Sequence, residues 1–212
     1  MKKIFFDLFD FVFPRRSNDE AIYATSPADF YEKIPRWSDS DIYPDIQAIF
    51  RYKDPTAKAM IKELKSSNSR HAAKIAGYAL AEHFEDKNVY GAVIIPMPIS
   101  KKRRKKRGYN QCELIAELFI REAESRGTQC HFAIRTDIIE KTIDTKKSAL
   151  QGRAARLEMN ESVFKSNRAV SHIRERVIVI DDVVTTGSTM RSAIKSLRNA
   201  GARDVLGIGI TH

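Results

Sequence analysis

The fold of this chain is decided by one stretch near its end, Val177-Ile178-Val179-Ile180-Asp181-Asp182-Val183-Val184-Thr185-Thr186-Gly187-Ser188-Thr189. The stretch opens on four β-branched residues, a continuous apolar run that predicts a strand buried on both faces, as in a parallel sheet. Two carboxylates and a polar turn follow, and then a helical pattern over 190–200. Ligands of such sheets bind at the carboxyl ends of the strands, so we expect a ligand site directly after Ile180.

The polar residues of this stretch match the chemical groups of a ribose 5-phosphate. Asp181 and Asp182 only accept hydrogen bonds when ionised, so they suit the two hydroxyls of a diol. The loop that follows offers backbone N–H groups, hydroxyls and a helix N-terminus to a phosphate. Its residues are Thr185, Thr186, Gly187, Ser188 and Thr189. Gly187 would allow a positive φ or a close backbone approach. The alternative reading is structural, with the Asp pair in a turn and the hydroxyl residues as helix caps.

Apolar spacing predicts the elements around this stretch. We expect helices over 70–84, 111–126 and 190–200, and strands over 92–95, 177–180 and 205–210. Gly201 is the expected cap at the end of the last helix. No lysine follows Gly187 as in a nucleotide-binding P-loop, and no Gly-x-Gly-x-x-Gly is present, which disfavours a dinucleotide site. The pattern predicts an α/β fold with a parallel sheet.

The stretch 177–189 resembles the signature of type I phosphoribosyltransferases. The chain upstream is similar to the ComF family, the competence-associated branch of that fold. The similarity rests on Tyr52-Lys53, Pro96-Met97-Pro98-Ile99-Ser100, Arg107-Gly108-Tyr109-Asn110-Gln111, and the spaced residues Thr145, Lys146, Lys147, Ser148, Leu150, Arg153, Arg156, Asn160 and Phe164. The resemblance spans about residues 50 to 212. It implies a central, mostly parallel sheet flanked by helices, with a small N-terminal appendage.

The resemblance also implies a site for phosphoribosyl pyrophosphate and Mg²⁺. Asp181 and Asp182 would hold the ribose hydroxyls, and the loop Thr185–Thr189 would hold the 5-phosphate. Because Mg²⁺ binds chiefly to substrate phosphates, only Asp182 is considered as a protein contact of the metal. A second wall, facing the pyrophosphate and including a flexible loop, is expected from Pro96, Met97, Pro98, Arg107, Gly108, Tyr109, Asn110 and Gln111.

Positive charge is concentrated in one run: Lys101, Lys102, Arg103, Arg104, Lys105, Lys106 and Arg107. The whole chain carries a formal charge of +10, whereas residues 1–50 hold six Lys/Arg against nine Asp/Glu. Seven adjacent cations repel one another, so we expect a mobile, solvated loop. Three roles remain open for it: a plain surface loop, capture of single-stranded DNA, and a flap over the pyrophosphate.

The N-terminal part is expected to be separate from the main domain, with a boundary between residues 50 and 51. An amphipathic helix is expected within residues 4–13, followed by an irregular linker. ComF-like proteins commonly carry a four-cysteine zinc module here, but residues 14–45 contain no cysteine or histidine, so no zinc is expected. Only Cys112 and Cys130 are present, and no apolar stretch is long enough for a membrane span. We expect a cytoplasmic protein, either free or at the inner face of the membrane.

Two functions remain open at this point. The first is binding of phosphoribosyl pyrophosphate in DNA uptake during natural transformation, with single-stranded DNA and an uptake helicase as partners. The second is a phosphoribosyltransferase that moves phosphoribose to a nitrogenous base. In relatives that act on 6-oxopurines an acidic residue occupies the position of Thr185, which argues against those bases as acceptors. No catalytic residue is assigned, and the oligomeric state is left open.

Overall fold

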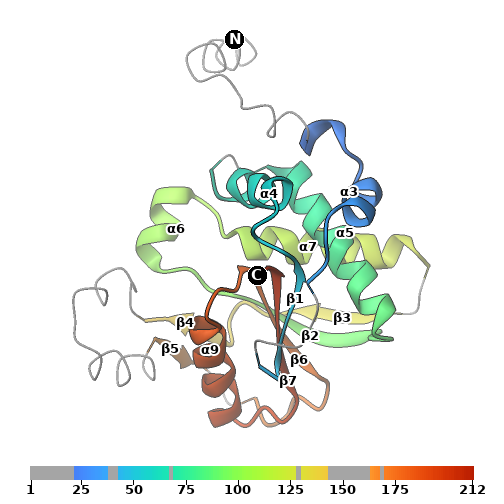
Figure 1. Cartoon of the computed structure of the whole chain (residues 1–212). Helices are drawn as coiled ribbons and strands as arrows, with labels where there is room; N and C mark the ends of the chain where they lie inside the picture. The colour runs from blue at the N-terminus through green and yellow to red at the C-terminus, as the bar shows by residue number, and fades with distance from the viewer. Residues whose placement is uncertain (1–21, 38–42, 67–68, 128–129, 143–162, 168–169) are drawn as a thin grey trace.

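The computed structural model describes residues 22–37, 43–66, 69–127, 130–142, 163–167 and 170–212. Its centre is a five-stranded sheet in the order β1-β7-β6-β2-β3, in which every neighbouring pair is parallel (Figure 1). The strands are β1 (Ile46–Phe50), β2 (Gly91–Pro96), β3 (His131–Ile134), β6 (Val177–Val183) and β7 (Val205–Thr211). A separate antiparallel pair consists of β4 (Ile139–Lys141) and β5 (Phe164–Ser166). The α/β class and the parallel sheet are confirmed.

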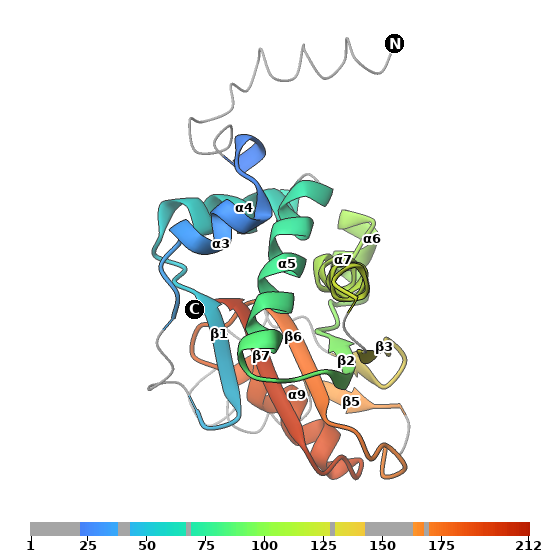
Figure 2. The ribbon, with the colours of Figure 1, turned by 90° about the vertical axis from the view of Figure 1, so that its right-hand side faces the viewer.

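Helices cover both faces of the sheet. One face packs against a core that includes α3 (Pro27–Lys33), α4 (Pro55–Ser66), α5 (Arg70–Asp86) and α7 (Gln111–Ser125). The other face packs against α9 (Ser188–Asn199) in a second core. Figure 2 shows α5 in front of the sheet and α9 behind it. The sheet therefore separates two apolar layers, with Ile178 and Ile180 of β6 in the first and Val177 and Val179 in the second.

Two glycines allow the helices to pack closely. A Cβ on Gly77 of α5 would lie 2.7 Å from the backbone nitrogen of Phe119 in α7. A Cβ on Gly207 of β7 would lie 2.5 Å from Cγ of Met190 in α9. Gly77 has no room for a side chain and sets how closely α5 and α7 approach, whereas a Cβ on Gly207 would displace the flexible side chain of Met190.

The sheet begins earlier in the chain than the expected boundary at residue 51. Strand β1 pairs with β7 through Ile46–Gly207 and Phe50–Thr211, and α3 packs on α5. Residues 22–37 and 43–50 are therefore in direct contact with the main domain. The helix expected within residues 4–13 and the motif residues 145–160 lie outside the described residues.

Strand β6 is longer than expected, and this moves the acidic pair. The apolar run predicts an end at Ile180, but the strand continues to Val183 because β7 runs on beside it, with Asp181 opposite Gly209 and Val183 opposite Thr211. The two aspartates thus belong to the strand and not to the turn after it. Helices over 70–86, 111–125 and 188–199 confirm the three predicted from spacing.

Candidate sugar-phosphate site

The acidic pair at the end of β6 is split between the two faces of the sheet. Successive strand residues point to opposite sides. Asp182 turns toward α4 and α7 and is 5% exposed. Its Oδ2 accepts a hydrogen bond from Nε2 of Gln111 (3.0 Å) and lies 3.2 Å from Nζ of Lys65. Asp181 turns toward α9, where it lines a pocket with the phosphate-loop residues. The pair therefore presents two carboxylates in different environments.

Burial makes Asp181 a weak acid. Loss of water around its carboxyl, followed by the charge of Asp182, raises the pKa of Asp181 to about 7. The thiol of Cys112 lies 3.6 Å from Oδ1 of Asp181. Burial and then the charge of Asp181 raise the pKa of this thiol well above its usual value, so Cys112 stays neutral. Asp181 consequently changes protonation near neutral pH, inside the pocket.

The predicted phosphate loop forms one side of that pocket. The lining residues are Asp181, Val183, Val184, Thr185, Gly187, Ser188, Thr189 and Met190. Gly187 precedes α9 in the left-handed region, with φ of 71°, as expected for a glycine in this turn. Thr185 and Thr186 are exposed, and the hydroxyl of Thr186 donates to Ser188 Oγ at 3.1 Å. The N-terminus of the twelve-residue helix α9 carries no acidic side chain in its first turn. These features leave its N–H groups available to an anion.

Tyr43 covers the outer side of this loop, a contact that the sequence analysis did not identify. A Cβ on Gly187 would lie 2.9 Å from a ring carbon of Tyr43. The guanidinium of Arg191 lies 4.3 Å from the centre of the same ring. Gly187 is therefore required twice, for its backbone conformation and for the space that Tyr43 occupies.

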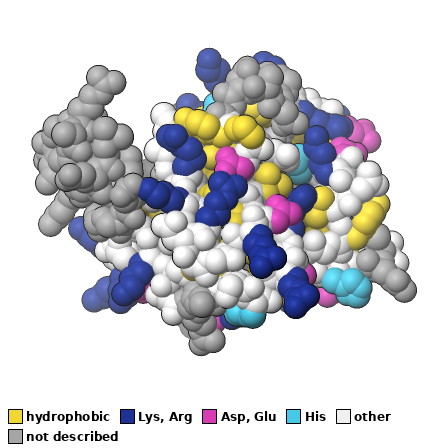
Figure 3. Space-filling model, turned by 90° about the horizontal axis from the view of Figure 1, so that it is seen from below, with side chains coloured by type: hydrophobic (Ala, Val, Ile, Leu, Met, Phe, Trp, Pro, Cys, Tyr) yellow, Lys and Arg dark blue, Asp and Glu magenta, His cyan; other side chains and the backbone are white. Residues whose placement is uncertain are grey.

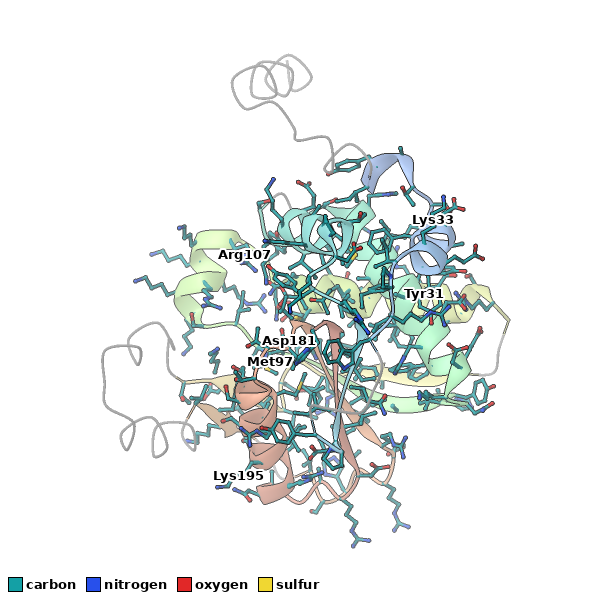
Figure 4. All side chains as sticks on the ribbon, in the orientation of Figure 1. Tyr31, Lys33, Met97, Arg107, Asp181 and Lys195 are labelled. Atoms are coloured by element: carbon teal, nitrogen blue, oxygen red, sulfur yellow. The ribbon has the colours of Figure 1, made fainter. Side chains whose placement is uncertain are left out.

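The turn after β2 lies beside the end of β6. Met97 is buried, and its N–H donates to the carbonyl of Ile180 at 2.8 Å. Figure 4 shows Met97 and Asp181 together between α6 (Lys101–Arg107) and α9, with Arg107 at the end of α6. The segment Pro96–Pro98 is thus fixed next to the acidic pair, as its assignment to a second wall requires.

The motif Arg107–Gln111 is packed against its surroundings. Gly108 ends α6 in the left-handed region, and Tyr109 donates its hydroxyl to the carbonyl of Leu64 at 2.6 Å. Asn110 is buried; its amide donates to the carbonyl of Met97 at 3.0 Å and accepts from the N–H of Cys112, which caps α7. Gln111 binds Asp182 as described above. These residues connect α4, the Met97 turn and the acidic pair, and the flexibility expected of this segment stays a prediction.

The basic run is a helix, α6, and the prediction of a loop was wrong. The hydroxyl of Ser100 accepts from the N–H of Arg103 at 3.3 Å, and the N–H of Gly108 donates to the carbonyl of Arg104 at 2.7 Å. Arg104 also pairs with Glu113. Lysine and arginine are good helix formers, and the caps together with solvation offset the repulsion. None of the seven side chains is buried, so the expected solvation is confirmed.

The described ranges hold neither a metal-binding cluster nor a membrane-spanning helix. Those ranges contain no group of three or more His, Cys, Asp or Glu side chains that could hold a metal ion. Among the helices of the same ranges, none is both long and apolar enough to cross a membrane.

Comparison with known proteins agrees with this geometry. Residues 114–211 match the phosphoribosyl transferase domain family. The chain is 29% identical to "Competence protein ComFC" of Bacillus subtilis over 73% of its own length and 54% of that protein. It is 27% identical to "Competence protein ComFC" of Streptococcus pneumoniae, over 80% of its own length and 69% of that protein. It is also 29% identical to "Competence protein F" of Haemophilus influenzae, over 53% of its own length and 46% of that protein.

The matched region contains β6, the phosphate loop and α9, which line the pocket, and also the neighbouring strand β7. The relatives extend the similarity to the segments that hold Lys65, Met97 and Gln111, since the first two alignments cover about three quarters of the chain. The chain spans about half the length of the Bacillus and Haemophilus proteins. The fold, the site geometry and these relatives together support a ComF-type protein with a phosphoribosyl transferase domain.

Proposed function

We propose that this protein binds phosphoribosyl pyrophosphate, together with Mg²⁺, at the end of β6. The observation that carries the proposal is the shared pocket of Asp181 and the phosphate loop Thr185–Thr189. A carboxylate that can accept from ribose hydroxyls and a loop that can bind a phosphate line one hollow, at the spacing of a ribose 5-phosphate signature. The Met97 turn, fixed beside Ile180, is the proposed wall for the pyrophosphate.

The cellular role that we propose is DNA uptake in natural transformation, with single-stranded DNA and an uptake helicase as partners. Two observations support it. The relatives are named competence proteins, and α6 presents seven cations without burying any of them. Figure 3 shows that, on the face seen from below, Lys and Arg are spread out with Asp and Glu among them. The uninterrupted run of α6 is therefore the better match to a nucleic-acid backbone. We place the protein in the cytoplasm, free or at the inner face of the membrane.

The alternative is catalysis, in which a nitrogen of a base displaces pyrophosphate from C1 of the ribose. The bond from C1 to the pyrophosphate oxygen breaks, and the new C1–N bond forms. Mg²⁺ and cations such as Arg107 would stabilise the charge of the leaving group. One observation favours this alternative: the raised pKa of Asp181, about 7, allows a carboxyl in the pocket to exchange a proton at neutral pH.

Calorimetric titration tests the ligand directly. Phosphoribosyl pyrophosphate with Mg²⁺ is titrated into the wild type and into the double variant Asp181→Asn/Asp182→Asn. We expect micromolar binding by the wild type and its loss in the variant, whose folding is checked by circular dichroism. A wild type that binds no phosphoribosyl pyrophosphate would refute the proposal, and DNA binding through α6 would then be the favoured function. Release of pyrophosphate with a panel of bases then separates binding from catalysis.

The salt dependence of DNA binding tests the role of α6. Replacing Lys101 to Arg107 by Ser and Gly should flatten the slope of log affinity against log salt, by roughly 0.7 for each phosphate of a single strand that the protein no longer neutralises. Because the same replacement removes a helix, a second variant that changes Lys101, Lys102 and Lys105 to Gln keeps the helix formers and removes three charges. A slope that neither variant changes would exclude α6 as the DNA-binding element.

A further inference from the structure

Lys65 belongs to the sugar-phosphate site although it is distant in sequence from the family signature. It lies at the end of α4, outside the region 114–211 that matches the family. Its Nζ is 3.2 Å from Oδ2 of Asp182, and its side chain is 38% exposed whereas that of Asp182 is 6% exposed. A carboxylate with so little exposure is costly to bury unless hydrogen bonds or a cation replace its lost hydration. Lys65 is the cation that pairs with it in the described structure.

The geometry around Asp182 restricts which oxygen a ligand can use. Lys65 and Gln111 both contact Oδ2. The two donors come from different helices, α4 and α7, and they approach the same atom, so the carboxylate cannot rotate without losing both. A carboxylate oxygen that is free of these donors, Oδ1, is then the acceptor that remains for a hydroxyl.

The position of Lys65 is itself fixed by the neighbouring motif. The carbonyl of Leu64, the residue before it, accepts the hydroxyl of Tyr109 at 2.6 Å. Tyr109 and Gln111 are two residues apart, so one short segment holds both α4 and Asp182. Movement of α4 would therefore move the ammonium group away from the carboxylate.

We propose that Lys65 is a positioning residue for the sugar: it acts through Asp182, orienting that carboxylate for the ribose hydroxyls, and does not touch the phosphates. The inference rests on the proposed function, since it concerns the same ligand. It predicts that Lys65 affects the binding of compounds that contain ribose and leaves the binding of pyrophosphate unchanged.

The test is calorimetry with three probes: phosphoribosyl pyrophosphate with Mg²⁺, ribose 5-phosphate, and inorganic pyrophosphate with Mg²⁺. The variants are Lys65→Met, which keeps the length of the side chain, and Lys65→Arg, which keeps the charge. Lys58→Met is the matched control, because it removes the same charge from an exposed position of the same helix. Thermal melts check that each variant is folded.

We expect Lys65→Met to weaken the binding of both ribose compounds by the same factor, about ten- to a hundredfold, as for loss of a charged hydrogen bond. Pyrophosphate affinity should stay equal to that of the Lys58→Met control, and Lys65→Arg should recover most of the lost affinity. In a double-mutant cycle, Lys65→Met should add little to the effect of Asp182→Asn, since both changes remove the same interaction.

Three results would overturn the inference. An equal loss for pyrophosphate would mean that Lys65 contacts phosphate directly. Additive losses in the cycle would mean that it does not act through Asp182. Unchanged affinities in Lys65→Met, with a wild type that binds, would show that the ion pair has no part in the site. A wild type that binds none of the ribose compounds refutes the proposed function, and the inference falls with it.

Discussion

Replacing Asp181 by Asn should stabilise the ligand-free protein, and increasingly so as the pH rises. The folded state raises the pKa of Asp181 from 3.8 to about 7, because the carboxyl is deprived of water and lies beside Asp182. Between these two values the folded chain holds a proton that the unfolded chain has released. The stability that this proton provides is complete below pH 3.8 and is lost as the pH rises through about 7. The asparagine of the variant carries no charge at any pH and avoids that loss.

The shift of about three pKa units corresponds to a ceiling of about 4 kcal/mol. Although its carboxyl is buried, Asp181 as a whole residue is of intermediate exposure, so water can reach part of it and relax around the charge. We therefore expect about half of the ceiling, about 2 kcal/mol, at pH 8. At pH 5 most of the folded wild-type protein still holds the proton, so the free energies of unfolding of the variant and the wild type should differ by less than at pH 8. Most of the increase in stability of Asp181→Asn over the wild type should appear between pH 5 and pH 8.

Urea denaturation at pH 5 and pH 8, in buffer without Mg²⁺ or phosphate, measures this difference. Asp29→Asn is the matched control, because the hydroxyl of Ser26 and then the charge of Lys33 lower the pKa of Asp29. The stability that Asp29 contributes is present above pH 3.8 and is lost only as the pH falls through the lower pKa of the folded state. The Asp29→Asn variant should therefore differ from the wild type in free energy of unfolding by the same amount at pH 5 and at pH 8. A destabilised Asp181→Asn at pH 8, or an effect independent of pH, would refute the reasoning.

Three further substitutions test contacts of the fold and the site. Gly187→Ala should lose about 1–2 kcal/mol of stability and weaken binding of inorganic phosphate, since φ is 71° and the new Cβ meets Tyr43; urea melts and phosphate titration measure both. Gly77→Ala should destabilise the protein by about 1–3 kcal/mol although alanine favours helices, because the new Cβ meets the backbone of Phe119. An unchanged midpoint of urea denaturation would contradict the close packing of α5 on α7. Asn110→Ala should cost about 1–3 kcal/mol, since Met97 and the α7 cap each lose a partner, and a thermal melt measures it.

The elements that could be predicted from sequence are those whose apolar spacing is regular. The run Val177–Ile180 and the run Val205–Ile210 indicated two parallel strands, and the spacing within 70–84 indicated α5. Gly187 could be assigned to a positive φ because few other residues suit a turn between a buried strand and a helix. Local patterns determine these features, so the sequence alone was enough.

The prediction for the basic run failed because repulsion was weighed without the residues at its ends. Ser100 and Gly108 stand where an N-cap and a C-terminal glycine belong, and this signal was available in the sequence. The role of Lys65 had no such signal. Its partner Asp182 lies far along the chain, and only the packing of α4 near the end of β6 brings them together. Tyr43 at the phosphate loop is hidden from sequence reasoning for the same reason.

The split of the acidic pair explains why two adjacent, identical residues differ in their chemistry. Strand alternation alone sends Asp182 to the face where Lys65 and Gln111 lie, and Asp181 to the face of α9. Asp182 therefore has a cation to balance its charge, whereas Asp181 has a neutral thiol beside it and the charge of Asp182 nearby. In the proposed complex, a ligand that offers hydroxyl donors and arrives with Mg²⁺ would supply what Asp181 lacks. The proposal therefore predicts that the site is complete only when it is occupied, unlike a structural ion pair.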